Sequence, residues 1–176
     1  MKKKNIAVID YNIGNVRSIL NALEKIGAHS VLTRDRNEIL SMDAIVLPGV
    51  GAFKQGMENL KANSLIDIVY KFIKSERPFL GICLGMQLLM EESEEFGLTE
   101  GLGVVKGKVI KLPVSNKSKE KLPHVAWDKI CEPKRAIWQG TILDGIENAV
   151  DVYFNHSFVA EPLDKNAVLS TTSYGK

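Results

Sequence analysis

The stretch Phe79-Leu80-Gly81-Ile82-Cys83-Leu84-Gly85-Met86-Gln87-Leu88-Leu89-Met90 predicts a buried strand that turns sharply into a helix. An apolar run begins after Pro78, and a glycine stands two positions before and two positions after the cysteine. This Gly-x-Cys-x-Gly pattern is the thiol form of the nucleophile elbow, in which a strained turn exposes the nucleophile. A helix N-terminus directly behind a thiol favours the thiolate. Cys83 is therefore the candidate nucleophile.

The alternative for Cys83 is an inert core residue, because free cysteine is among the most buried residue types. The flanking Gly81 and Gly85 favour chemistry over that alternative. Cys131 lies in Lys129-Ile130-Cys131-Glu132-Pro133, which has no comparable setting, and we expect it to be structural. Two unlike cysteines form no disulfide framework, which fits a reducing cytoplasm.

The composition predicts one domain over residues 1–176, with a hydrophobic content of 45% that is sufficient for a substantial core. The net charge is only +2, so neither a nucleic-acid partner nor an anionic membrane is expected. The apolar stretch after the N-terminal lysines is broken by Asp10, too early for a signal peptide. No apolar run reaches the roughly 20 residues of a membrane span. We expect a cytoplasmic protein.

Strands and helices alternate in the first hundred residues. Short apolar runs predict strands at 6–9, 30–33, 44–47 and 79–82, and helical spacing is seen at 16–26, 37–40 and 65–73. Asn15 is expected to cap the first helix and Gly27 to end it. A helix is expected to continue from Leu84 to a solvent-facing end at 91–95. Continuously apolar strands favour a mostly parallel sheet covered on both faces, an α/β three-layer sandwich.

From Gly101 onward the chain contains short β-like pieces separated by loops. They lie at 104–105, 109–110, 125–127, 152–154 and 168–172, and are expected to extend the sheet with antiparallel or mixed strands. The polar stretch 117–121 is expected to be a solvated loop.

Several cofactor and metal motifs are absent from the sequence. Only Gly14 follows the first strand, so the dinucleotide fingerprint is missing, and 103–109 resembles a phosphate loop only superficially. The three histidines, His29, His124 and His156, have no metal-ligand spacing. We expect neither a cofactor nor a metal.

The loop Pro48-Gly49-Val50-Gly51 follows one predicted strand, and Cys83 follows the next. Open α/β sheets place their sites beyond the carboxyl ends of the strands, where both would lie. A thiolate that attacks a carboxamide generates an oxyanion, which backbone N–H groups can stabilise. The N–H of Leu84 is one natural donor, and Val50 or Gly51 could supply the second. Alone, this loop would be read as an ordinary tight turn.

These two motifs resemble those of the class I (triad) glutamine amidotransferases. Within that family the chain is similar to the HisH group, the glutaminase subunits of imidazole glycerol phosphate synthases. The resemblance covers essentially the whole chain and rests on motifs in the family's order: Tyr11-Asn12-Ile13-Gly14-Asn15-Val16-Arg17-Ser18, Gly49-Val50-Gly51-Ala52-Phe53, Cys83-Leu84-Gly85-Met86-Gln87-Leu88-Leu89, Pro123-His124-Val125-Ala126-Trp127 and Phe154-Asn155-His156-Ser157-Phe158.

The resemblance implies a flavodoxin-like fold and a defined reaction. Cys83 would attack the side-chain amide of glutamine, form a γ-glutamyl thioester and release ammonia. A partner resembling HisF, a (β/α)8 barrel, would receive the ammonia and close the imidazole ring in histidine biosynthesis, which forms imidazole glycerol phosphate and AICAR. The implied roles are an oxyanion hole of Val50, Gly51 and Leu84, a glutamine pocket of Gly49, Gln87, Ser157 and Phe158, and a partner interface with Asn15, His124 and Trp127.

One departure from the family concerns the catalytic base. The family's histidine and glutamate lie in a C-terminal His-Pro-Glu motif, which this sequence does not contain. A cysteine hydrolase needs a base for the thiol and an acid for the leaving ammonia. We therefore expect a chain truncated at its C-terminus, with little glutaminase activity; His156 is disfavoured as a substitute base. Ala126 and Asp128 also depart from the usual Gly and Asn.

Two other functions remain open from the sequence. A HisH-like paralogue could supply ammonia for amidation of a surface-polysaccharide sugar, or the chain could be a catalytically inactive subunit that docks on a barrel. A generic α/β-hydrolase is disfavoured because no downstream Asp and His pairing completes its triad.

Overall fold

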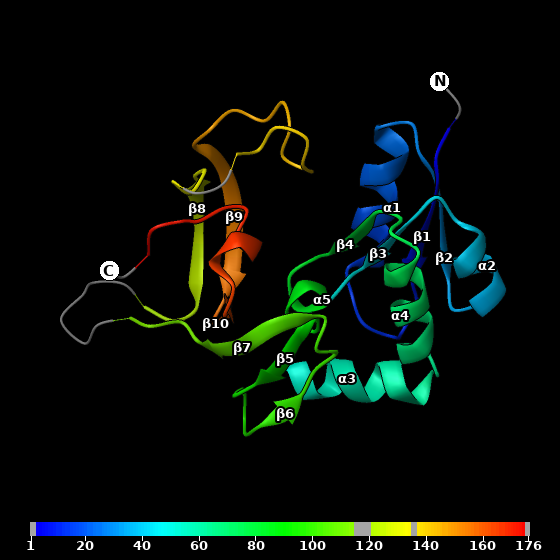
Figure 1. Cartoon of the computed structure of the whole chain (residues 1–176), viewed down its shortest axis with the longest axis horizontal. Helices are drawn as coiled ribbons and strands as arrows, with labels where there is room; N and C mark the ends of the chain where they lie inside the picture. The colour runs from blue at the N-terminus through cyan, green and yellow to red at the C-terminus, as the bar shows by residue number, and fades with distance from the viewer. Residues whose placement is uncertain (1–2, 115–120, 135–136, 175–176) are drawn as a thin grey trace. The chain divides into compact units, whose positions relative to one another are not determined.

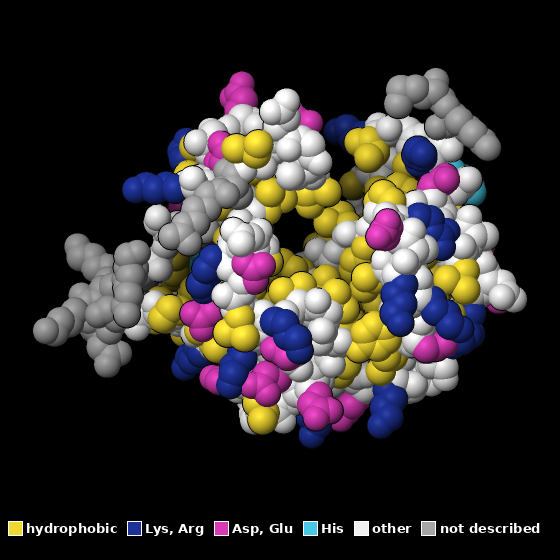
Figure 2. Space-filling view, viewed as in Figure 1, with side chains coloured by type: hydrophobic (Ala, Val, Ile, Leu, Met, Phe, Trp, Pro, Cys, Tyr) yellow, Lys and Arg dark blue, Asp and Glu magenta, His cyan; other side chains and the backbone are white. Residues whose placement is uncertain are grey.

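The computed structural model describes residues 3–114, 121–134 and 137–174, so 117–120 of the expected polar loop lie outside the described residues. The chain forms two compact units, residues 1–104 and 105–176 (Figure 1). On the face that Figure 2 shows, Lys and Arg side chains are interspersed with Asp and Glu, as the net charge of +2 leads one to expect. No helix among the described residues is long and apolar enough to cross a membrane.

The first unit is organised by a four-stranded parallel sheet. Its strands are β1 (Asn5–Ile9), β2 (His29–Thr33), β3 (Ala44–Leu47) and β4 (Phe79–Gly81), in the order β2-β1-β3-β4. The central strands β1 and β3 are apolar along most of their length, and their last three residues are buried. Burial on both faces explains why these strands show no alternation of polar and apolar residues.

The helices α1 (Val16–Lys25), α2 (Arg36–Ser41), α3 (Phe53–Ala62) and α4 (Ile66–Lys74) connect the parallel strands. The connection from β1 to β2 moves across the sheet in one direction, whereas the connections from β2 to β3 and from β3 to β4 move in the other. Right-handed crossovers therefore place α1 on one face of the sheet. They place α2 and α4 together on the other face, where the two helices contact each other (Figure 1). The expected three-layer α/β arrangement with a mostly parallel sheet is confirmed.

The ends of α1 match the sequence prediction in part. Gly27 has φ +81° and its N–H bonds Glu24 O at 2.8 Å, so it ends the helix as expected. Asn15 occupies the N-cap position, but its side chain makes no capping hydrogen bond. By contrast, Asp35 caps α2 by accepting from the N–H of Glu38 at 2.8 Å.

The prediction of a long helix after Cys83 is wrong. Only one turn forms, α5 (Leu84–Gln87), and the chain then enters β5 (Met90–Ser93), which pairs antiparallel with β6 (Thr99–Glu100). The carbonyls of Leu88 and Met90 accept from the N–H groups of Leu102 and Gly103, at 2.9 and 3.0 Å. These tertiary hydrogen bonds take the place of the next helical turn, so 91–95 is not a helix end.

The second unit consists of antiparallel pairs. Strand β7 (Val105–Lys111) pairs with β10 (Phe158–Pro162), and β8 (His124–Ile130) pairs with β9 (Val150–His156). A short 3-10 helix, η1 (Lys165–Ala167), follows β10. The prediction of a strand at 168–172 is wrong, because the segment makes only an isolated bridge, between Thr171 and Cys131. Strand β10 was not expected from the sequence.

An ion pair joins the ends of β1 and β2 at the carboxyl edge of the parallel sheet. Asp10 accepts from Nε of Arg34 at 3.1 Å and also from a terminal guanidinium nitrogen, which bonds Asn12 Oδ1 as well. The hydrogen bond from Arg34 lowers the pKa of Asp10. A lowered folded-state pKa stabilises the protein above the unfolded value near 3.8 and loses that effect as the pH falls through the folded value.

We expect Asp10→Asn to lower the free energy of unfolding at pH 7 by about 1 kcal/mol, a modest effect because the pair is partly solvated. Urea denaturation at pH 7 should show the difference, which should shrink below about pH 3.8 and close once the pH falls beneath the lowered folded-state pKa of Asp10. Asp67→Asn, which breaks the pair with Arg36, is the control and should have a smaller effect, because Asp67 is more exposed than Asp10. An equal gap at acidic pH would contradict the assignment.

Candidate active site

Cys83 lies at the predicted turn between a strand and a helix. Strand β4 ends at Gly81, α5 begins at Leu84, and Cys83 between them is exposed, with φ 51° and ψ −114°. A non-glycine residue in this region costs on the order of 1–3 kcal/mol, which the surrounding packing must offset. The alternative of an inert core cysteine is excluded because the side chain is exposed.

The packing around the turn requires residues without side chains. A Cβ atom on Gly85 would lie 1.9 Å from the carbonyl oxygen of Leu47, and one on Gly81 would lie 2.7 Å from the backbone of Met86. The N–H of Ile82 also bonds Leu47 O, at 3.0 Å. The end of β3 and the start of α5 are therefore in direct backbone contact.

The loop Pro48-Gly49-Val50-Gly51 leaves β3 beside this turn. A Cβ on Gly49 would lie 2.5 Å from the backbone nitrogen of Gly85, so the loop begins against α5. Further along, Val50 is 53% exposed, and Gly51 has φ +95° with no heavy atom near the position of a Cβ. The loop is thus packed at its start and open at Val50 and Gly51.

Two residues at this edge were missed by the sequence analysis. Tyr11 is fully buried and its hydroxyl donates a hydrogen bond to the carbonyl oxygen of Pro48. Burial raises the pKa of Tyr11, and the nearby Cys83 adds a smaller contribution in the same direction. Glu95 accepts a hydrogen bond from the N–H of Phe53 at 2.7 Å, at the start of α3 just after the loop. Neither contact can be predicted from a local sequence pattern, because its two partners are distant in sequence.

The residues that the resemblance assigns to the glutamine pocket form two groups, one in each unit. In the first unit, Gly49 packs on α5, which also carries Leu84 and the buried Gln87, one turn after Cys83. In the second unit, Ser157 and Phe158 adjoin at the β9–β10 junction, where the carbonyl oxygen of Ser157 accepts from the N–H of Leu112 at 2.9 Å.

A chain of hydrogen bonds lies along the β8–β9 pair. His124 contacts Asp128 through Nε2 at 2.7 Å and His156 Nε2 through Nδ1 at 3.2 Å, and His156 Nδ1 donates to Phe158 O at 2.9 Å. Both ring nitrogens of His156 are engaged in these contacts.

The implied interface residues differ in exposure. Asn15 precedes α1 in the first unit, and His124 in the second is 0% exposed, so it supports β8 from within. Trp127 on the opposite face of β8 is 69% exposed and lies 5.6 Å, centroid to centroid, from the exposed Tyr153. Trp127 and Tyr153 thus lie on the exposed face of the β8–β9 pair.

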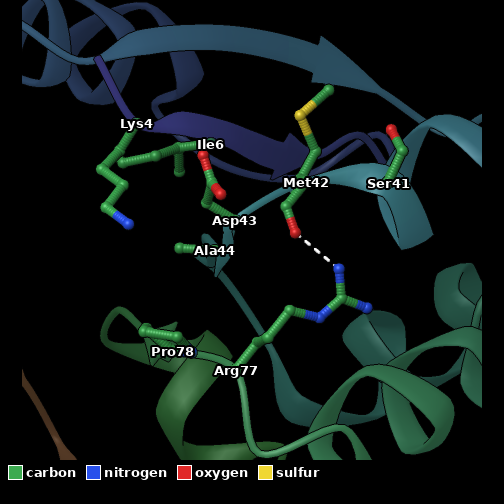
Figure 3. A pocket seen from close by; sticks show the side chains of 8 residues that line it. All are labelled: Lys4, Ile6, Ser41, Met42, Asp43, Ala44, Arg77 and Pro78. Carbon is green, nitrogen blue, oxygen red and sulfur yellow. Dashed lines mark hydrogen bonds between the residues drawn. The ribbon is translucent and has the colours of Figure 1, made fainter. Parts of the chain in front are cut away.

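A separate hollow of about 470 Å³ lies at the amino edge of the parallel sheet (Figure 3). Three charged residues line it, Lys4, Asp43 and Arg77. Arg77 donates to the carbonyl oxygens of Leu40 and Met42 and stacks over Phe72 at 4.1 Å. The Arg77 guanidinium is therefore engaged in holding α2 and α4. In the part of the chain that the structure describes, no cluster of three His, Cys, Asp or Glu could hold a metal ion.

We expect Gly85→Ala to disrupt the site, because its Cβ would overlap Leu47 O at 1.9 Å and force β3 and α5 apart. The free energy of unfolding should fall by about 3 kcal/mol or more, a cost typical of severe overpacking. Gly97→Ala is the control: its site is open and only the positive φ of +109° is unfavourable, so about 1 kcal/mol is expected. Thermal denaturation would measure both, and equal losses would contradict the backbone contact.

The comparisons with known proteins agree with this geometry. Residues 7–176 match the family described as glutamine amidotransferase class-I. The chain is 40% identical over 173 residues to the imidazole glycerol phosphate synthase subunit HisH of Geobacter metallireducens, covering 97% of this chain and 80% of that protein. It is 45% identical to the subunit HisH 1 of Methanococcus maripaludis, covering 97% and 81%.

Solved structures support the fold alone, because their sequence identities are low. A crystal structure of a glutamine amidotransferase matches with a TM-score of 0.69 at 17% identity, covering 94% of this chain and 78% of that one. The structure of PurLQS from Thermotoga maritima matches with a TM-score of 0.66 at 18% identity, covering 98% and 76%. Taken with the exposed Cys83 turn, these matches show that the chain belongs to the class I glutamine amidotransferases, in the HisH family.

Proposed function

We propose that this chain is the cytoplasmic glutaminase subunit of an imidazole glycerol phosphate synthase, and that it supplies ammonia to a HisF-like (β/α)8 cyclase. The observation that carries the proposal is the exposed, strained Cys83 between β4 and α5, held beside the loop 48–51. The names of the relatives, which are HisH subunits, support the pathway and the need for a second subunit. They also favour it over a surface-sugar paralogue.

In the proposed reaction the Cys83 thiolate attacks the carbonyl carbon of the glutamine side-chain amide. A C–S bond forms, the electron pair of the C=O moves to oxygen, and collapse of this intermediate breaks the C–N bond. The nitrogen leaves as ammonia after it accepts a proton, and water then hydrolyses the γ-glutamyl thioester to glutamate. Catalysis requires a base near the thiol. His29 is unsuitable because it lies at the opposite end of the strands, at the start of β2, hydrogen-bonded to Asn5.

The proposed oxyanion hole uses backbone N–H groups on both sides of Cys83. Leu84 is the first residue of α5, so its N–H has no intrahelical acceptor. Val50 and Gly51 lie in the open part of the loop, where their peptide units can turn toward the thiol. Preorganised donors of this kind stabilise the oxyanion that forms during amide attack. Gly49, Gln87, Ser157 and Phe158 are proposed to hold the glutamine.

The proposed partner surface is the exposed face of the β8–β9 pair. Trp127 and Tyr153 form an aromatic pair there, and Val125 beside them is 52% exposed. Aromatic residues dominate the binding energy of protein interfaces, so this face is suited to a permanent partner subunit. Asn15, and His124 through the strand it supports, are proposed to contribute to the same association.

The proposal predicts selective labelling of Cys83 by a glutamine-derived chloroketone, in which CH2Cl replaces the amide NH2. Mass spectrometry should locate one adduct on Cys83, and free glutamine should protect the thiol. Cys131→Ala should be labelled like the wild type, and Cys83→Ala should not be labelled. Equal labelling of Cys131, or no protection by glutamine, would show that Cys83 has no glutamine site and would favour an inactive docking subunit.

We expect Trp127→Ala to weaken binding to a HisF-like barrel by about 30-fold, since truncating an interface hot spot costs about 2 kcal/mol or more. Isothermal titration calorimetry with the purified barrel would measure the dissociation constant. Ile142→Ala is the matched control, because Ile142 is 75% exposed but lies outside β8 and β9. The proposed surface is refuted when both variants bind like the wild type.

A further inference from the structure

Pro48, at the start of the loop beside Cys83, is held from two directions. The Tyr11 hydroxyl donates to the Pro48 carbonyl oxygen. On another side the turn after β1 packs on the proline ring: a Cβ on Gly14 would lie 2.9 Å from Pro48 Cβ. Tyr11 is itself fixed, because its ring is fully buried and Asn59 Nδ2 donates to its backbone oxygen at 3.0 Å.

The Pro48 carbonyl belongs to the peptide unit that joins Pro48 to Gly49. A hydrogen bond to that oxygen fixes the plane of this peptide, from which the chain continues to the N–H groups of Val50 and Gly51. In the middle of the loop Val50 is 53% exposed and Gly51 has open space at the position of a Cβ, and the far end is held at the buried Phe53, whose N–H bonds Glu95. The orientation of the two N–H groups therefore depends on the Pro48 end, which Tyr11 and the contact of Gly49 with α5 hold, together with the anchored Phe53 end.

We propose that Tyr11 is a positioning residue for the oxyanion hole, whose buried hydroxyl orients the Gly49–Gly51 peptides toward the carbonyl that Cys83 attacks. This inference rests on the proposed glutaminase function and assigns a role to a residue outside the reacting groups. Burial raises the pKa of Tyr11, so its hydroxyl keeps its proton and remains a donor when Cys83 carries a negative charge.

Two thiol reagents separate positioning from simple stability. Reaction of Cys83 with the glutamine-derived chloroketone begins with attack of the thiolate on the ketone carbon, which forms a C–S bond and an oxyanion. The sulfur then displaces chloride from the adjacent carbon through a three-membered ring, and the first C–S bond breaks as the C=O bond re-forms. Reaction with iodoacetamide forms a C–S bond and releases iodide at a saturated carbon, with no oxyanion. A defect confined to the oxyanion hole should slow the first reaction and spare the second.

We expect Tyr11→Phe to lower the second-order rate constant for the chloroketone about tenfold, with less than a twofold change for iodoacetamide. The loss should be smaller than the 100-fold or more that follows removal of an oxyanion donor, because the donors remain but are less well oriented. Tyr70→Phe is the matched control: the Tyr70 hydroxyl donates to Leu102 O in the same unit, away from the loop. Its two rate constants should both match the wild type.

Gly14→Ala provides a second variant should Tyr11→Phe fold poorly by circular dichroism. Its Cβ would press on Pro48 from the other side, so the chloroketone rate alone should fall again. Unchanged chloroketone rates in the folded variants would overturn the role of Tyr11, and so would an equal loss with both reagents. Failure of the wild-type chain to react selectively with the chloroketone would instead refute the proposed function itself.

Discussion

The site depends on the contact between the end of β3 and the start of α5. Leu47 O accepts from the N–H of Ile82, and the backbone of Gly85 lies so close to the same oxygen that no side chain fits. This contact offsets the strain of Cys83 at φ 51°, because the turn cannot relax without breaking it. It also holds Gly49 against α5, so one close approach of backbones determines both the direction of the thiol and the start of the loop beside it.

Much of the first unit could be predicted from residue patterns. Strands β1 and β3 are apolar because both faces of the sheet are covered, and Gly27 ends α1 in the left-handed conformation that its position predicted. The nucleophile turn was predictable because it requires glycine at positions 81 and 85, and the pair Gly81 and Gly85 can be recognised in the sequence. Helix α3 was missed because Gly56 interrupts its apolar spacing; in the fold, that glycine lets the helix approach Leu88.

The remaining errors share a physical cause, which is hydrogen bonding between residues distant in sequence. The helix expected after Cys83 stops because Leu102 and Gly103 bond the carbonyls of Leu88 and Met90. The segment 168–172 has the composition of a strand but meets its partner only at Thr171. The contact of Tyr11 with Pro48 spans 37 residues, and no local pattern marks a tyrosine whose acceptor is a backbone oxygen.

The polar chain of His124, Asp128 and His156 has a consequence for the opposite face of its sheet. Ala126 between His124 and Asp128 leaves room for their side chains to meet, with His124 stacked on Phe154 at 4.8 Å. Sliding β8 by one residue along β9 would turn these polar groups outward and put Trp127 inside. Such a slip would break the hydrogen bond between His124 and His156, which is the contact of this polar chain that joins β8 to β9. The buried His124 and its contact with His156 thereby favour the strand alignment that displays the tryptophan on the opposite face.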